Sequence, residues 1–325
     1  MNRIAGIILV VASAAGFGTF AIFARYAYAD GMDALTILFL RFSLAAVVML
    51  PLLLVQRERL PRGAVLLRLI GMGALAYVAA SIAYLMALQY ASAGLVALLL
   101  YLYPIFVTLL AILVLHEPIN LVKWLALGLA VVGTVLAVGP LSGQALGMLL
   151  AVASAVIYAF YVIVGKGVMR QVSPVQSSAV IFATAGVCNG VLMLVAGAHF
   201  PATANGWAAI IALVVIATVL PVIAFLAGLK RIGPTNAAML STLEPVVTIL
   251  LAAWWLNETQ TPLTLLGGGL ILAAVLLLTQ SELRRRPSSV TLDQAGGSRQ
   301  SESPQHGSAS RQPKAALEPG AQAVE

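Results

Sequence analysis

The stretch Met86–Leu115, MALQYASAGLVALLLYLYPIFVTLLAILVL, contains no Lys, Arg, Asp or Glu, and Leu125–Gly165 contains none either. Runs that are apolar on every face are typical of transmembrane helices, whereas the strands of a transmembrane barrel alternate polar and apolar residues. The whole chain of 325 residues is 61% hydrophobic and 9% charged, against about 25% charged in an ordinary soluble domain. The sequence therefore predicts an all-α integral membrane protein and excludes a water-soluble globule.

Apolar runs separated by loop-forming residues predict ten transmembrane helices, because a helix needs about 20 mostly apolar residues to cross a bilayer. Their approximate limits are residues 4–24, 35–55, 66–88, 94–115, 121–139, 146–165, 176–197, 207–228, 235–256 and 263–280. Basic residues gather in the connections on one side of the predicted membrane: Arg57, Arg59, Arg62, Arg68, Lys123, Lys166, Arg170, Lys230, Arg231, Arg284, Arg285 and Arg286. The positive-inside rule places this side, and with it both termini, in the cytoplasm. We therefore expect a multi-pass protein of the cytoplasmic membrane and no nucleic-acid partner, despite the net charge of +7.

Residues 281–325 differ from the rest of the chain, since they are rich in Ser, Gln, Pro and Gly and have almost no large apolar residue. Such a composition cannot bury enough apolar surface to fold. We expect a disordered cytoplasmic tail, which is either a solvated extension or a segment that binds a regulatory partner.

A constant shift along the chain aligns its first half with its second half without a net gap. Pro104 then falls on Pro245 and Glu117 falls on Glu258, which is far less expected by chance than matches of Leu or Ala. Two repeats follow, residues 1–140 and 141–280, each with five predicted spans. Because five is odd, the second repeat enters the membrane inverted, and inverted repeats are typical of secondary transporters. A duplicated scaffold that transports nothing is the alternative.

Both repeats carry sequence signatures that resemble the EamA family of the drug/metabolite transporter superfamily. The matching stretches are Leu243–Ala252 with Asn257–Glu258 in the second repeat, Tyr103–Ala111 with His116–Glu117 in the first, and Phe17–Thr19 and Leu40–Phe42 near the start. The family usually has Gly before the closing Glu, where this chain has His116 and Asn257. The resemblance covers about residues 4 to 280 and implies ten helices, cytoplasmic termini and small-metabolite transport, often efflux. It does not imply a particular substrate.

Glu244 is the one acidic residue clearly inside a predicted span, and it precedes Pro245. At a rise of 1.5 Å per residue it lies about 15 Å deep, where a charge costs on the order of 3 kcal/mol. We expect it to face a cavity or a partner. The alternative is that Glu244 satisfies backbone groups that Pro245 releases, because proline lacks an N–H. The equivalent Pro104 predicts a second helix break at the same position of the first repeat.

Polar and aromatic residues recur at helical spacing on four predicted spans, and each set therefore shares one face of its helix. The sets are Ser13, Phe17 and Phe20 on the first span, Tyr77, Ser81 and Tyr84 on the third, Ser154, Tyr158 and Tyr161 on the sixth, and Ser241, Glu244 and Thr248 on the ninth. Such faces suit an amphiphilic organic solute, because rings contact its carbon skeleton and hydroxyls orient its polar groups. Packing between helices is the alternative for each set. Arg41 either pairs with Glu244, attracts an anionic substrate, or extends to the membrane interface.

These observations favour a secondary transporter that exports a small organic metabolite, such as an amino acid, by alternating access. The alternatives are a proton-coupled multidrug exporter and a non-transporting receptor or scaffold. The small multidrug resistance proteins use a Glu in their first span, which this chain lacks, so Glu244 is the embedded carboxylate left for proton coupling. We expect no enzyme, cofactor or metal, because His116, His199 and His306 are scattered and catalysis needs clustered groups. The expected partners are the bilayer and a small-molecule substrate, and homodimerisation stays open.

Overall fold

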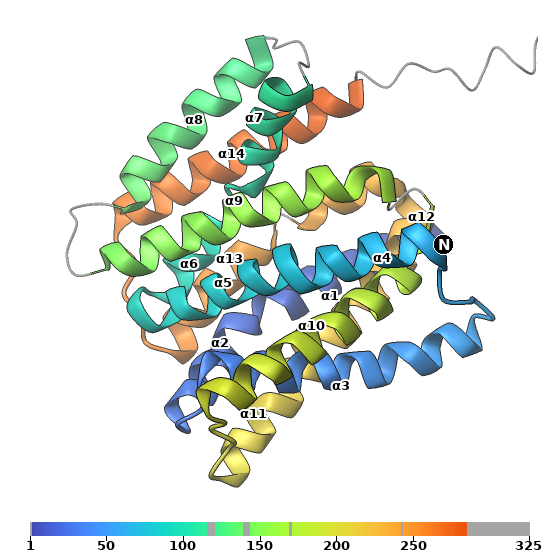
Figure 1. Cartoon of the computed structure of the whole chain (residues 1–325). Coiled ribbons are helices and arrows are strands. Elements are labelled where there is room, and N and C mark those ends of the chain that lie inside the picture. The colour runs from blue at the N-terminus through green and yellow to red at the C-terminus, as the bar shows by residue number, and fades with distance from the viewer. Residues whose placement is uncertain (1, 116–120, 139–143, 169–170, 242, 285–325) are drawn as a thin grey trace, which may run out of the picture. The chain divides into compact units, whose positions relative to one another are not determined.

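The computed structural model describes residues 2–115, 121–138, 144–168, 171–241 and 243–284, and these residues form helices and their connections (Figure 1). The first half contains α1 (Asn2–Gly18), α2 (Phe20–Ala29), α3 (Ala34–Val55), α4 (Gly63–Gly71), the π-helical η1 (Met72–Tyr77), α5 (Val78–Tyr90), α6 (Ala93–Leu100), α7 (Tyr103–Leu115) and α8 (Leu121–Val138). The second half contains α9 (Ala145–Val168), α10 (Pro174–Ala196), α11 (Ala204–Val214), the π-helical η2 (Val215–Val219), α12 (Leu220–Ser241), α13 (Leu243–Trp255) and α14 (Pro262–Arg284). From residue 285 onward, the predicted tail lies outside the described residues.

Seven helical segments of the described residues are long and apolar enough to cross a bilayer. They are Arg3–Ala29, Ala34–Val55, Gly63–Tyr90, Ala93–Leu110, Ala145–Gly165, Pro174–Ala196 and Ala204–Leu229. The remaining three predicted spans coincide with shorter apolar helices, Leu121–Ala137, Leu243–Trp255 and Pro262–Leu277. The all-helical membrane fold is thus confirmed, and the count of ten crossings stays a prediction.

The structure corrects the predicted spans at two places. The first span continues to Ala29 and contains a one-residue turn at Thr19, between α1 and α2, where the Thr19 hydroxyl donates to Gly16 O at 2.6 Å. The connection predicted at residues 229–234 is instead part of α12, whose helical backbone continues through Gly233 and Pro234. Sequence reasoning missed both, because Gly and Pro mark only a tendency of the chain to leave a helix.

Contacts between helices follow the repeat. The first helix of the first repeat, α1, packs along α12, and its equivalent in the second repeat, α9, packs along α5. Ser13 donates to Pro221 O at 2.7 Å between α1 and α12, and Ser154 donates to Ala80 O at 2.8 Å between α9 and α5. The shift that places Pro104 on Pro245 also places Ser13 on Ser154 and Ala80 on Pro221. The π-helical segments η1 and η2 also overlap under the same shift. The two repeats therefore share this departure from α-helical geometry as well as their helix contacts.

Two further helix pairs complete the bundle. Figure 1 shows α8 beside α14 and α3 beside α10, in agreement with their contacts. The α8–α14 pair approaches so closely that a Cβ at Gly133 would lie 2.7 Å from Gly267 O. In the α3–α10 pair, a Cβ at Gly186 would lie 3.0 Å from the Ser43 N. Gly186 therefore supports a close helix contact, as its spacing with Gly190 predicts.

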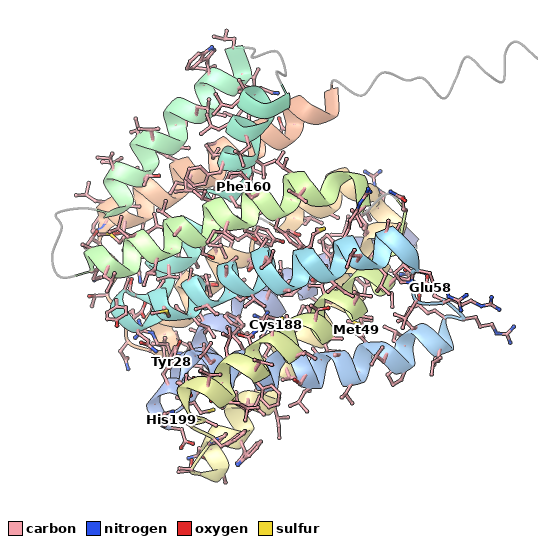
Figure 2. All side chains as sticks on the ribbon, in the orientation of Figure 1. Tyr28, Met49, Glu58, Phe160, Cys188 and His199 are labelled. Atoms are coloured by element: carbon pink, nitrogen blue, oxygen red, sulfur yellow. The ribbon has the colours of Figure 1, made fainter. Side chains whose placement is uncertain are left out.

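Loop contacts tie the α3–α10 pair at both ends. At one end Asp33 caps the first turn of α3 and also binds His199 Nδ1 at 3.2 Å. At the other end, the Ser173 hydroxyl donates to Glu58, and Gln176 donates to Arg59 O at 2.7 Å. Figure 2 shows Glu58 and His199 at opposite ends of this pair. Residues of α3 and α10 between these ties line the cavity described next.

Candidate functional site

A cavity of about 410 Å³ lies among the helices of both repeats. Eleven of the thirteen residues predicted for a substrate pathway line it: Phe17, Phe20, Arg41, Tyr77, Ser81, Tyr84, Ser154, Tyr158, Tyr161, Ser241 and Glu244. They come from α1, α2, α3, η1, α5, α9, α12 and α13. Helical periodicity therefore selected faces that converge on one space, although periodicity alone does not say which helices meet.

Ser13 and Thr248 lie outside the cavity lining. Ser13 binds the Pro221 carbonyl, and the Thr248 hydroxyl lies 3.0 Å from Gly18 O and 3.1 Å from Glu244 O. Both side chains are buried. Their hydroxyls thus bind backbone at helix contacts, which is the packing alternative for these two residues.

Glu244 lies in the first turn of α13. The break between α12 and α13 denotes the interruption of the helical hydrogen-bond pattern at the Ser241 carbonyl, because Pro245 lacks the N–H that would bind it. A carboxylate is favoured in the first turn of a helix, because the helix dipole places partial positive charge at the N-terminus. Its Oε2 is 2.9 Å from the Tyr101 hydroxyl, which also lies 2.7 Å from Ser241 O. Ser241 O is the carbonyl that loses its helical partner because Pro245 has no N–H. The donor that compensates for Pro245 is therefore Tyr101 and not Glu244.

Arg41 projects from α3 into the same cavity. Its Nε donates to Thr218 Oγ1 at 3.0 Å, and its guanidinium carbon lies 4.1 Å from the centre of the Phe20 ring. Within the described ranges, no ion pair joins Arg41 to Glu244, although both line the cavity. The contacts with Phe20 and Thr218 hold the Arg41 guanidinium inside the helix bundle. In this structure the guanidinium is therefore neither paired with Glu244 nor extended toward the membrane interface.

Ten of the 22 residues that line the cavity are aromatic. Tyr158 stacks on Tyr161 with ring centres 5.4 Å apart, and Tyr103 meets the edge of Tyr158 at 5.0 Å. Tyr77 lies 5.6 Å from Tyr161, and Phe20 lies 5.5 Å from Tyr84. These offset and edge contacts are the arrangements that ring quadrupoles favour. The wall is therefore a connected set of rings with hydroxyl groups at intervals.

Sequence reasoning missed several residues of the cavity wall. They are Ala80, Leu100, Tyr101, Tyr103, Ser177, Ser178, Ile181, Phe182, Thr218, Val222 and Phe225, whereas Phe20, which shares the face of Phe17, does line the cavity. For Tyr103 a signal was present, since the repeat alignment places it on Glu244. For Thr218 there was none, because its role depends on the π-helical turn of η2, in which its hydroxyl also donates to Leu213 O at 2.9 Å.

The two prolines lie at the starts of their helices. Pro104 is in the first turn of α7, after the turn at Tyr101 and Leu102, and Pro245 is in the first turn of α13. Proline is tolerated there because the first N–H groups of a helix have no helical acceptor. A turn thus precedes α7 and Pro104 in the first repeat. In the second repeat residue 242, between α12 and α13, lies outside the described residues, so the helix break expected at Pro245 stays a prediction.

Glu258 caps the N-terminus of α6. Its carboxylate accepts hydrogen bonds from Ala93 N at 2.8 Å and Gly94 N at 3.3 Å, and Arg25 lies 3.7 Å away. Arg25 also donates to Ala91 O at 2.5 Å. Glu258 therefore makes a contact at a helix end. Its repeat equivalent, Glu117, lies outside the described residues.

Within the part of the chain that the structure describes, no three His, Cys, Asp or Glu side chains come together as metal ligands would. Cys188 is a free thiol on α10 (Figure 2). The chemistry that the cavity offers is therefore recognition by one cation, one carboxyl group, hydroxyls and ring faces.

Comparison with known proteins gives a consistent result. The family model of the EamA-like transporter family matches residues 4–139 and 145–280. An uncharacterized transporter of Archaeoglobus fulgidus is 28% identical over 271 residues, covering 82% of this chain and 94% of its own length. Uncharacterized transporter YcbK of Bacillus subtilis is 25% identical over 284 residues, covering 82% and 89%. One crystal structure, 18% identical, superposes with a TM-score of 0.62 over 87% of this chain and 99% of the other, and it supports the fold alone.

Proposed function

Because the chain belongs to the EamA-like transporter family, we propose that it exports a small amphiphilic organic solute, such as an amino acid, by alternating access of two inverted repeats. The observation that carries this proposal is the cavity of about 410 Å³, which is lined by Arg41, Glu244 and aromatic rings from both repeats. This volume lies in the range of small-molecule sites, about 300 to 1,000 Å³. A receptor or scaffold would have no need of such a space.

The charges of the cavity favour a zwitterion. The Arg41 guanidinium suits a carboxylate, and the Glu244 carboxyl group suits an ammonium group. The tyrosine wall between them fits the carbon skeleton of a solute. A lipophilic cation, the substrate of the alternative multidrug exporter, would contact the rings equally well, but the positive charge of Arg41 opposes it.

The repeated helix pairs support alternating access. Two copies of one packing unit, related by inversion, have equivalent conformations facing either side of a membrane, so the halves can exchange them around a central site. The ten spans, the cytoplasmic termini and the location in the cytoplasmic membrane are part of the proposal. Reporter fusions after Leu60 and after Gln280 should both read as cytoplasmic, and a C-terminal fusion on the opposite side would contradict the inverted arrangement.

Counterflow in proteoliposomes tests the substrate class. Separate batches of vesicles are loaded with one solute each: an amino acid, the matching amine that lacks the carboxylate, a sugar or a lipophilic cation. The protein should exchange at least one amino acid across the vesicle membrane, and it should exchange the matching amine only slowly. Arg41→Gln should reduce this preference about tenfold or more, since a buried partner for the carboxylate is lost. Arg41→Lys keeps the charge without the planar guanidinium and should have a smaller effect. Exchange of lipophilic cations alone would favour the multidrug alternative, and no exchange of any solute would favour the scaffold.

The direction of transport needs sided membranes. Export predicts uptake of the identified solute by inside-out vesicles when an energy source is supplied, and none by right-side-out vesicles under the same gradient. The reverse result would identify an importer.

A further inference from the structure

The Tyr101 hydroxyl lies between two hydrogen-bond acceptors. Its oxygen is 2.7 Å from the backbone oxygen of Ser241 and 2.9 Å from Oε2 of Glu244. A phenol has one hydrogen to donate, and its oxygen can also accept. The hydroxyl therefore cannot donate to both groups at once. Both contacts are hydrogen bonds only when Glu244 is protonated, because the carboxyl group then donates to Tyr101 while Tyr101 donates to Ser241.

The helix break deprives the Ser241 carbonyl of its usual donor. In an uninterrupted helix the N–H of residue 245 would bind it, but Pro245 has no N–H. The Ser241 side chain does not compensate, since its hydroxyl donates to Ala237 O at 2.9 Å. Unpaired backbone groups inside a bilayer are strongly disfavoured. The Tyr101 hydroxyl therefore stabilises the break between α12 and α13 when its hydrogen points to Ser241.

We infer that Tyr101 couples the protonation of Glu244 to the conformation of the break between α12 and α13, a coupling that builds on the proposed transport function. With a proton on Glu244, hydrogen bonds run from Glu244 through Tyr101 to Ser241, and the break is held. When that proton leaves for the cavity, the Tyr101 hydrogen turns to the carboxylate and the Ser241 carbonyl is released. No other covalent bond changes. The backbone that borders the cavity thus responds to a single proton.

Other charged and titratable groups near Glu244 do not replace Tyr101 in this arrangement. The helices packed against α13 are α1, α2 and α6, and their titratable residues are Arg3, Arg25, Tyr26 and Tyr28. Arg25 is bound to Glu258, and Tyr28 donates to Leu85 O at 2.8 Å. The titratable groups on the other cavity walls are Arg41, Tyr77, Tyr84, Tyr103, Tyr158 and Tyr161. Among the described residues, Tyr101 is the one side chain with a hydrogen bond to the Glu244 carboxyl group.

Hydrogen exchange measured by mass spectrometry tests the coupling on the purified full chain in lipid nanodiscs, with protons as the only ligand. The reporter is the peptide that spans the break, and its exchange rates are divided by the intrinsic rate at each pH. In the wild-type protein, amides that flank the break should exchange on the order of fivefold faster once Glu244 ionises, the factor expected for one hydrogen bond. The change should follow the titration of a single proton.

Two variants should move the exchange in opposite directions. Glu244→Gln keeps a neutral donor next to Tyr101, so exchange at the break should stay slow at every pH. Tyr101→Phe removes the donor, so exchange should be fast at every pH. Tyr103→Phe is the matched control, because it removes a hydroxyl from the same cavity and should keep the wild-type change with pH.

Three results would overturn the coupling: no change with pH in the wild-type protein, a wild-type change in Tyr101→Phe, or loss of the change in Tyr103→Phe. If Tyr101→Phe does not fold, Glu244→Gln still tests the coupling. If the exchange rate at the break still changes with pH in Glu244→Gln, the proton responsible is not on Glu244, and the coupling is overturned. Because the measurement uses no substrate, its failure is distinct from a failure to detect transport.

Discussion

The two repeats agree at their helix contacts and differ at the cavity. The serine hydrogen bonds, the close contacts of Gly6 and Gly147 and the π-helical segments recur at equivalent positions of the two copies. At the helix breaks the residues diverge, because Tyr101 of the first repeat corresponds to Thr242, and Glu244 of the second corresponds to Tyr103. Several helix contacts are thus the same in both copies, whereas the phenol and the carboxyl group that meet at the break each occur in one copy.

Charge repulsion gives a physical reason for this difference. Tyr103 lines the same cavity as Glu244, so a Glu in place of Tyr103 would bring two carboxyl groups into one desolvated space, where like charges oppose ionisation. Helix packing sets no such limit, because each copy of a contact is buried at its own interface. Substitutions at duplicated helix contacts should therefore change stability by similar amounts in both repeats. Substitutions at equivalent positions of the cavity should have different effects.

The largest expected effect is at the glycine pair Gly6 and Gly147. A Cβ at Gly147 would lie 2.6 Å from Ala91 Cβ and 2.8 Å from Ala91 N, and a Cβ at Gly6 would lie 2.5 Å from Ile232 Cγ2 and 2.8 Å from Arg231 Cβ. Gly147→Ala and Gly6→Ala should each destabilise the chain by about 1 to 3 kcal/mol, because each new methyl group meets a backbone atom or a Cβ that moves only with the backbone. Melting temperatures of the detergent-purified variants measure both.

A second glycine pair provides the control. Gly128 and Gly269 are also repeat equivalents, both are exposed, and a Cβ at either has nothing within 4 Å. Gly128→Ala and Gly269→Ala should leave the melting temperature unchanged or raise it, since Ala is the better helix former. A loss at these positions as large as at Gly147 would show that the repeat contacts are not the cause.

The next largest effect is expected for Glu258→Ala. The change leaves Ala93 N and Gly94 N without an acceptor and removes the partner of Arg25, so we expect a loss of about 1 to 2 kcal/mol. Glu258→Gln, which keeps one acceptor, should lose less. The repeat alignment places Pro234, which has no N–H and lies within α12, on Ala93, so Glu117 has no equivalent helix start to cap. Glu117→Ala should therefore lower the melting temperature less than Glu258→Ala, and an equal loss would show that the cap is not the cause.

The variants Ser13→Ala and Ser154→Ala separate the effect of a lost helix contact on stability from the effect of a changed cavity wall on the transport rate. Each removes one buried hydrogen bond to a carbonyl, so each should lower stability by about 0.6 kcal/mol. Only Ser154 also lines the cavity, so only Ser154→Ala should reduce the counterflow rate at equal amounts of folded protein. Equal losses of rate in both variants would mean that the helix contact, and not the cavity, limits transport.

The smallest effect concerns pH at the loop contacts of the α3–α10 pair. The Thr203 hydroxyl, which donates to Asp30 at 2.5 Å, lowers the pKa of Asp30. Partial burial opposes ionisation of Asp33, but hydrogen bonds from Thr36 and His199 outweigh it, so the pKa of Asp33 is also lowered. The ionised forms of Asp30 and Asp33 therefore stabilise the folded protein above about pH 4, and this stabilisation is lost as the pH falls through their lowered pKa values.

Exchange measurements should therefore show that the connection between α10 and α11 opens more readily in acid, with a fall in melting temperature of a few degrees at most. Asp33→Asn should reduce this pH dependence, because it removes one of the two titrating groups. The α8–α14 pair, whose close contact joins Gly133 and Gly267 without a titrating group, serves as the internal reference. An acid-induced loss of protection that is unchanged in Asp33→Asn, or equal in the reference pair, would contradict a role for the two aspartates.

Much of the cavity could be predicted from residue spacing. Tyr77, Ser81 and Tyr84 share a face because they lie at helical spacing, and all three line the cavity. Ser13 had the same signal and lies outside it, since spacing shows which residues share a face and not what that face meets. The turn at Thr19 and the course of α12 through Pro234 depend on contacts with other helices.

The sequence by itself determined that the chain is apolar enough to enter a membrane and that it is duplicated, because hydropathy and repeat spacing are properties of the chain alone. Only the tertiary structure decided which polar groups meet. Tyr101 contacts Glu244 across 143 residues and Arg41 contacts Thr218 across 177 residues. Both contacts depend on where a helix breaks or widens and on how closely its neighbours pack, and these positions are set by the whole bundle rather than by any one segment.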